Sequence, residues 1–334
     1  MIGVKIYTKP DDMAWTLQQW DELGLDTIFM GPKLRQEADF IAQVKASGRQ
    51  LIAIFPVFYD KFWLQDHPED FALTADGTQA VHDWVKFACP SSAQFMAHKR
   101  HELETVLATV QPDGVSLDFM RFFVYWEMVS KKETTAIVQT CFDERCLQRF
   151  AQEMAVVIPA ELETVAEKSR WILEMHMDEW AAWKCGVIET AVSQLTTHTR
   201  SIDPGIKLGL HAVPWLMDEY EGAVHKVAGQ DLGKLAQYVD FFTPMCYSHM
   251  VKENPAWVHD IVVGQAKAGG IPVLPSIQVE KAYREEDFAV DTFAQAIEAA
   301  LQPPSAGILY WSWEALTRSA EKLALAKSLS PVKG

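Results

Sequence analysis

The chain has 334 residues, of which 49% are hydrophobic, and it carries a formal net charge of −15 at pH 7. This length and composition allow a large buried core, and no long Pro/Gly/Ser-rich linker divides the chain, so we expect one domain over residues 1–334. The negative charge argues against binding to nucleic acid, whose phosphates are usually met by a basic protein face. Neutral or cationic small molecules fit better as substrates.

The N-terminus and the cysteines predict a cytoplasmic protein. The opening "MIGVKIYTK" is strand-like and shows no signal-peptide pattern. No apolar run reaches the ~18 residues that a membrane span needs, so we expect no membrane association. Five cysteines form an odd set without zinc-ribbon spacing, and we expect reduced thiols that pack rather than bind a metal: Cys89, Cys141, Cys146, Cys185 and Cys246.

Short apolar runs alternate with longer amphipathic stretches along the chain. Strands are predicted at 3–8, 27–31, 50–58, 114–119, 206–212, 241–247, 271–278 and 306–312. Helices are predicted at about 11–23, 33–47, 93–110, 167–201, 230–238, 256–268, 288–301 and 315–328. Eight strands, each followed by a helix, predict an α/β fold of the (β/α)8 TIM barrel type. A doubly wound sheet is the alternative, but no glycine-rich phosphate loop follows the first strand.

Two connections are longer than a barrel requires. The connection 59–92 follows the third strand and carries Asp60 among several aromatic residues. The connection 123–166 follows the fourth strand, and its stretch "DERCLQRFAQEM" has the spacing of an amphipathic helix, which predicts a helical insertion. Barrel enzymes build their sites from the loops at the C-terminal ends of the strands, so we expect both connections to surround a site there.

The alternation of side chains along a strand selects candidate residues. On the fourth strand Ser116, Asp118 and Met120 share one face, which we expect to line the barrel interior and to direct Asp118 into its mouth. On the seventh strand the same test aligns Gln278 and Glu280.

Other strands add rim residues by the same test. They are Lys5 and Tyr7 on the first strand, His211 on the fifth and Tyr247 on the sixth. The eighth strand is ambiguous, and we favour the phase that turns Trp311 and Trp313 inward and leaves Glu314 in the first turn of the last helix.

The stretch "DGVSLDFMRF", residues 113–122, resembles the fourth-strand signature of glycoside-hydrolase-like barrel proteins, Asp-Gly-Ile/Val-x-Leu-Asp-x-x-Arg-Tyr/Phe. Further stretches resemble the same proteins over most of the chain: "HPEDFALTADGTQ", "FACPSS", "CFDERCLQRFAQE", "EWAAWKCGVIETAV", "FFTPMCYSHM" and "GILYWSWEAL". The resemblance implies a TIM barrel that hydrolyses a glycosidic bond in an oligosaccharide or glycoside, so the expected partner is a carbohydrate.

Glycoside hydrolysis usually needs two carboxyl groups, one on each side of the bond that breaks. Asp118 is the first candidate and Glu280 the second, with Asp60 and Glu314 behind it. Met120 stands where chitinase-type barrels carry their general acid, and a thioether cannot donate a proton. The sequence does not assign which carboxyl is the acid, nor whether the reaction retains or inverts configuration.

The other candidates are expected to bind substrate: Lys5, Tyr7, Asp60, Arg121, His211, Tyr247, Gln278, Trp311 and Trp313. Structural roles remain open for several of them, since Asp118 could be an acid neutralised by Arg121 or Lys5, and Glu280 precedes a charged, surface-like stretch. No cofactor or metal is implied. A metal-dependent hydrolase is the rival enzyme class, although "KIYTK" lacks the His-x-His pair of amidohydrolase barrels. A barrel that binds carbohydrate without cleaving it also remains open.

Overall fold

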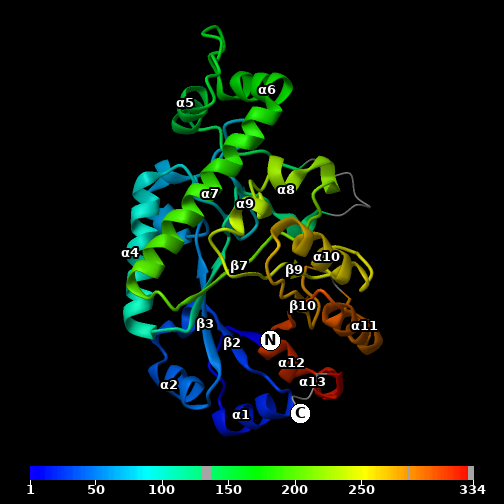
Figure 1. The fold of residues 1–334 in the computed structure, drawn as a ribbon. Helices are drawn as coiled ribbons and strands as arrows, with labels where there is room; N and C mark the ends of the chain where they lie inside the picture. The colour runs from blue at the N-terminus through cyan, green and yellow to red at the C-terminus, as the bar shows by residue number, and fades with distance from the viewer. Residues whose placement is uncertain (130–136, 284–285, 330–334) are drawn as a thin grey trace.

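The computed structural model describes residues 1–129, 137–283 and 286–329 (Figure 1). Within these ranges the strands are β1 (Ile2–Ile6), β2 (Thr27–Met30), β3 (Gln50–Pro56), β4 (Val81–His82), β5 (Val85–Lys86), β6 (Gly114–Asp118), β7 (Lys207–Leu210), β8 (Phe241–Phe242), β9 (Met245–Cys246), β10 (Ser276–Gln278) and β11 (Ile308–Trp311). Each of the eight predicted strands overlaps at least one of them.

The main sheet closes into a barrel because its two end strands are halves of one strand. Nine strands pair in the order β8-β7-β6-β3-β2-β1-β11-β10-β9, and the pairings between them are parallel. Only Thr243 and Pro244 separate β8 from β9. Thr243 N–H donates to the Leu210 carbonyl on one side, and Ser276 N–H donates to the Pro244 carbonyl on the other, both at 2.8 Å. Pro244 has no N–H to donate, which accounts for the interruption. The predicted (β/α)8 barrel is confirmed.

Helices surround this barrel (Figure 1). The α-helices of the described ranges are α1 (Met13–Glu22), α2 (Ala38–Ala46), α3 (Lys61–Asp66), α4 (Ala93–Val110), α5 (Glu144–Glu153), α6 (Val165–Met175), α7 (Met177–Ile202), α8 (Ala223–Lys226), α9 (Leu232–Leu235), α10 (Trp257–Gly269), α11 (Val290–Leu301), α12 (Trp313–Arg318) and α13 (Ala320–Leu329). Short 3-10 helices are η1 (Pro32–Gln36), η2 (Pro68–Asp70), η3 (Trp126–Met128) and η4 (Glu219–Glu221). None of these helices is long and apolar enough to cross a membrane.

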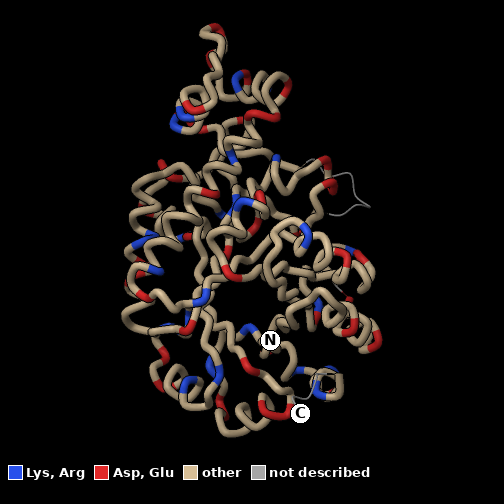
Figure 2. The backbone as a smooth tube through the Cα atoms, viewed as in Figure 1, with Lys and Arg blue, Asp and Glu red and all other residues tan. Residues whose placement is uncertain are grey.

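The two long connections carry structure of their own. The connection 59–92 contains α3, η2 and the antiparallel pair β4–β5. The connection 123–166 contains η3, α5 and the start of α6, while its residues 130–136 lie outside the described ranges. Figure 1 shows α5, α6 and the adjoining end of α7 projecting beyond the barrel. Figure 2 shows Asp and Glu spread over the outer helices and this projection rather than gathered on one element.

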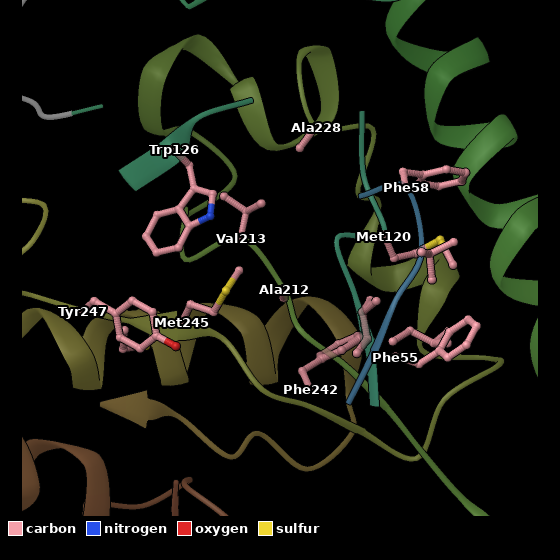
Figure 3. Close-up of a cluster of buried hydrophobic side chains, with 14 of the residues drawn as sticks. Phe55, Phe58, Met120, Trp126, Ala212, Val213, Ala228, Phe242, Met245 and Tyr247 are labelled. Atoms are coloured by element: carbon pink, nitrogen blue, oxygen red, sulfur yellow. The ribbon is translucent and has the colours of Figure 1, made fainter. Parts of the chain in front are cut away.

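The barrel interior is apolar below its mouth. Six buried residues form a hydrophobic cluster separate from the main core: Phe29, Ile52, Ile54, Phe241, Leu274 and Leu309. The larger core fills the space between the barrel and its helices, and Figure 3 draws part of it, including Met120 with Phe55 and Phe58. Met120 therefore packs as a core residue at the position where chitinase-type barrels carry an acid.

Candidate active site

A cavity of about 420 Å³ opens at the C-terminal ends of the strands. This volume lies within the range of small-molecule sites. Its polar and charged side chains are Lys5, Tyr7, Asp118, Arg121 and Glu127. Its aromatic walls are Tyr59, Trp84, Phe119, Tyr247, Tyr283 and Trp311, which come from the strand ends and from the loops above them.

Asp118 is the last residue of β6, and its carboxylate reaches the cavity floor. The N–H of Phe119 donates to Asp118 Oδ1 at 2.8 Å, and His211 Nδ1 lies 3.4 Å from the same oxygen. Burial by itself would raise the pKa of the Asp118 carboxyl. The nearby His211 and the cations Lys5 and Arg121 outweigh this effect and lower that pKa to about 2. Asp118 is therefore ionised at neutral pH.

Lys5 and Tyr247 form a second polar group on the floor. Lys5 Nζ donates to the Tyr247 hydroxyl at 3.2 Å, and the Tyr247 ring stacks on Trp311 with centroids 4.2 Å apart and planes at 18°. Burial lowers the pKa of Lys5 to about 8, although the charge of Asp118 opposes this effect. Trp311 therefore offers a fixed aromatic face beside an amine and a hydroxyl.

Arg121 is almost fully buried beside the cavity. Its guanidinium lies over the rings of Phe87 and Phe119, at 5.2 and 5.0 Å from their centroids. Its Nη2 donates to the Val124 carbonyl at 3.4 Å, whereas its Nε has no partner among the described residues. The stacking and burial fix Arg121 as a rigid cation, close enough to influence the protonation of both cavity carboxyls.

Glu127 is the second carboxyl group of the cavity. It lies in η3, where the preceding Trp126 is fully buried with its ring centroid 5.9 Å from that of Tyr247 (Figure 3). This anchor fixes the 3-10 turn over the cavity. Glu127 is 7% exposed, and its Oε2 makes no hydrogen bond within the described part of the chain. Burial raises the pKa of Glu127 to about 7; Arg121 opposes this effect and Asp118 adds to it.

The pKa values of the two cavity carboxyls therefore differ widely. At neutral pH Asp118 is ionised, whereas a large fraction of Glu127 keeps its proton. Environments that separate the pKa values of two neighbouring carboxyls are typical of acid–base assignments in active sites. The arrangement can supply a proton donor and an anion to one bound molecule.

Sequence reasoning did not select Glu127. It lies beyond the fourth strand, where alternation gives no direction for a side chain. A usable signal was nevertheless present, because Glu127 is the one acid in the apolar run "FFVYWEMV". That argument is the same one that singled out Asp118.

Glu280 does not line the cavity. β10 ends at Gln278, so the strand alternation does not extend to Glu280. The Glu280 carboxylate is 38% exposed and pairs with both Arg318 Nε, at 2.8 Å, and Arg318 Nη2. Gln278 is buried below the rim, where it accepts from the Met250 N–H and donates to the Glu280 carbonyl.

Three other predicted site residues also lie outside the cavity. Asp60 caps α3 and contacts His98 Nε2 at 3.2 Å, in a neighbouring depression. His211 is buried beneath Asp118, and burial lowers its pKa, so the ring is neutral at pH 7. Trp313 packs edge-on against Trp20 outside the barrel, because the chain enters α12 after Trp311.

Glu314 and Phe119 differ in their relation to the cavity. Glu314 lies in the first turn of α12, as expected, and its Oε1 accepts the N–H groups of Tyr7 and Thr8 at 2.7 and 2.8 Å. It holds the end of β1 and does not line the cavity. Strand alternation would turn Phe119 away from Asp118, but its φ of 51° ends the alternation and its ring lines the cavity.

The fold is similar to solved glycoside hydrolases. The PgaB (BpsB) glycoside hydrolase domain from Bordetella bronchiseptica matches with a TM-score of 0.74 and 10% identity, over 100% of this chain and 99% of that one. A β-galactosidase from Marinomonas ef1 matches with a TM-score of 0.71 and 12% identity, over 98% and 58%. A catalytic mutant of a GH42 β-galactosidase from G. stearothermophilus matches with a TM-score of 0.67 and 13% identity, over 98% and 56%.

The chain thus spans little more than half the length of these β-galactosidases. No family model and no curated protein matches its sequence. Together with the closed barrel, the structural matches show that the chain has a TIM-barrel fold similar to that of these glycoside hydrolases.

Proposed function

We propose that the protein is a glycoside hydrolase that cleaves a glycosidic bond of an oligosaccharide or glycoside in this cavity, with Asp118 and Glu127 as its carboxyl pair. The observation that carries the proposal is the separation of their pKa values, to about 2 and about 7, within one cavity. The similarity of the fold to glycoside hydrolases supports it.

The opposite protonation states assign the roles. Glu127 donates its proton to the oxygen of the departing sugar or alcohol, which removes the cost of expelling an alkoxide. Asp118 faces the sugar as an anion and acts as the nucleophile or as the base that activates water, while its charge stabilises the oxocarbenium-like transition state. Arg121 and Lys5 keep Asp118 ionised throughout.

The walls of the cavity suit a sugar ring. Trp311 and Trp84 present aromatic faces on which the C–H faces of a pyranose can stack, and Tyr59 and Phe119 extend this surface. Hydroxyl groups of the sugar would then reach the amine of Lys5 and the phenol of Tyr7. Glu280 is disfavoured as the second carboxyl because it is exposed and paired with Arg318.

The test is hydrolysis of a panel of aryl glycosides and oligosaccharides, beginning with β-galactosides because several structural neighbours are β-galactosidases. On a substrate that the parent cleaves, we expect Asp118→Asn and Glu127→Gln each to lower kcat/KM by about 10²–10⁴-fold. Glu280→Gln is the matched control and should stay within about threefold. Full activity in both cavity variants would refute the pair.

A panel in which no glycoside is cleaved can still distinguish a barrel that only binds carbohydrate. If oligosaccharides bind, as measured by calorimetry, and Trp311→Ala weakens that binding while no glycoside is cleaved, the barrel binds carbohydrate without hydrolysing it. In that case the proposed catalysis is wrong and the aromatic walls keep their assigned role.

A further inference from the structure

Three buried thiols and one carboxylate converge outside the cavity. Cys89 lies between β5 and α4, whereas Cys141, Asp143 and Cys146 lie at the start of α5. One ligand atom from each of the four residues lies within 4.8 Å of all the others. The three cysteines are fully buried and Asp143 is 9% exposed. We propose that these four residues bind one zinc ion as a structural site, independently of the function proposed for the cavity.

The spacing of the atoms fits tetrahedral zinc. A Zn–S bond of about 2.3 Å gives S···S edges of about 3.8 Å, and Cys89 Sγ and Cys146 Sγ are 3.3 Å apart. Cys141 Sγ lies 2.8 Å from Asp143 Oδ2. An outward movement of a few tenths of an ångström admits the ion. Zinc accepts thiolate and carboxylate ligands together, and the thiol protons leave to solvent as the ion binds.

The surroundings of the cluster suit its charge. Leu73 N–H donates to Cys141 Sγ at 3.2 Å, and Cys146 N–H donates to Asp143 Oδ1 at 3.1 Å, which leaves Asp143 Oδ2 turned toward the thiols. Three thiolates and a carboxylate around Zn²⁺ carry a net charge of −2. Arg145 Nε, 3.4 Å from Asp143 Oδ1, offsets part of it. Backbone donors and a nearby cation are the outer partners that stabilise metal-bound thiolates.

The place of the cluster defines its role. Four protein ligands leave no open position for a substrate, which is the pattern of a structural zinc site. None of the four residues lines the cavity. The ion would join the connection after β3 to the connection after β6, and the latter also carries η3 with Glu127. Zinc would therefore clamp the two long connections that enclose the cavity.

The experiment measures metal in the full-length protein purified without chelators. We expect about one zinc per chain by mass spectrometry. After removal of the zinc, added Co²⁺ should give sulfur-to-metal charge-transfer and intense visible bands, which report tetrahedral thiolate ligation. Cys141→Ser should weaken zinc binding at least about 100-fold, whereas Cys185→Ser, which removes a buried thiol of α7 outside the cluster, should leave it unchanged.

Asp143→Asn is a second variant that tests the site even if Cys141→Ser fails to fold. Asparagine preserves the N-cap of α5 while removing the anionic ligand, so the variant should fold and bind zinc about 10–100-fold more weakly. The proposal is overturned if the parent binds neither zinc nor Co²⁺. It is also overturned if Cys185→Ser loses as much metal as Cys141→Ser, or if alkylation without reductant shows a Cys89–Cys146 disulfide.

Discussion

At the scale of single residues, the candidate site depends on two carboxyls that the fold surrounds differently. Asp118 meets two cations and an imidazole, so its anion is favoured. The burial of Glu127 outweighs the effect of the nearby Arg121, so its neutral form is favoured. Alternation predicted the first of these positions, because Asp118 ends a strand. It could not predict the second, because the depth of Glu127 depends on the burial of Trp126 beside Tyr247, a contact between distant parts of the chain.

Glu127→Gln should stabilise the protein in a pH-dependent manner. The pKa of Glu127 rises from its ordinary 4.5 to about 7 on folding, so between these values the folded state holds more protons than the unfolded state. The free energy of unfolding of the parent therefore falls as pH rises through this window. The amide avoids that loss, so the variant should gain up to about 3 kcal/mol at pH 8. Urea unfolding at pH 8 measures the gain.

Urea unfolding at pH 4 supplies the control, because Glu127 is protonated in the folded state there and the variant should match the parent. An equal gain at both pH values would show that the amide acts through packing rather than through ionisation.

At the scale of elements, alternation is reliable only while a strand continues. It places Ser116 and Asp118 correctly on β6 and stops at Phe119, where the backbone becomes left-handed. It also fails beyond the end of β10, and therefore Glu280 turns to Arg318 instead of the cavity. Strand ends are set by local backbone conformation and by neighbouring loops, which a periodic pattern does not encode.

Gly209 on β7 shows how tightly the barrel interior is packed. A Cβ at this position would lie 2.5 Å from the ring of Phe241 and 3.1 Å from Ser116 Oγ. Gly209→Ala should therefore destabilise the protein by about 1–3 kcal/mol in urea unfolding, because β7 and β8 must separate.

Gly186→Ala in α7 is the matched control, since a Cβ there meets nothing within 4 Å and alanine favours the helix by about 1 kcal/mol. Equal effects of the two substitutions would contradict the packing described for the interior of the barrel.

At the scale of the whole molecule, the count of eight strands and eight helical stretches was enough to predict the barrel. Each strand of the main sheet pairs with its neighbours in sequence order. The barrel closes where Pro244 divides one strand into β8, which pairs with β7, and β9, which pairs with β10. The geometry of the two long connections was not predictable, because contacts such as Cys89 with Cys146 join residues far apart in the chain. Those connections carry both Glu127 and the proposed zinc ligands.

The pH dependence of kcat/KM tests the proposed carboxyl pair most directly, since it reports the ionisation of the free enzyme. On a glycoside that the parent cleaves, kcat/KM should be high while Asp118 is ionised and Glu127 is protonated. It should therefore be high at pH values well above 2 and fall near pH 7, where Glu127 loses its proton. With a dinitrophenyl glycoside, whose leaving group needs no proton, Glu127→Gln should keep measurable activity and lose this alkaline fall. The same alkaline fall in Glu127→Gln would contradict the assignment of Glu127 as the acid.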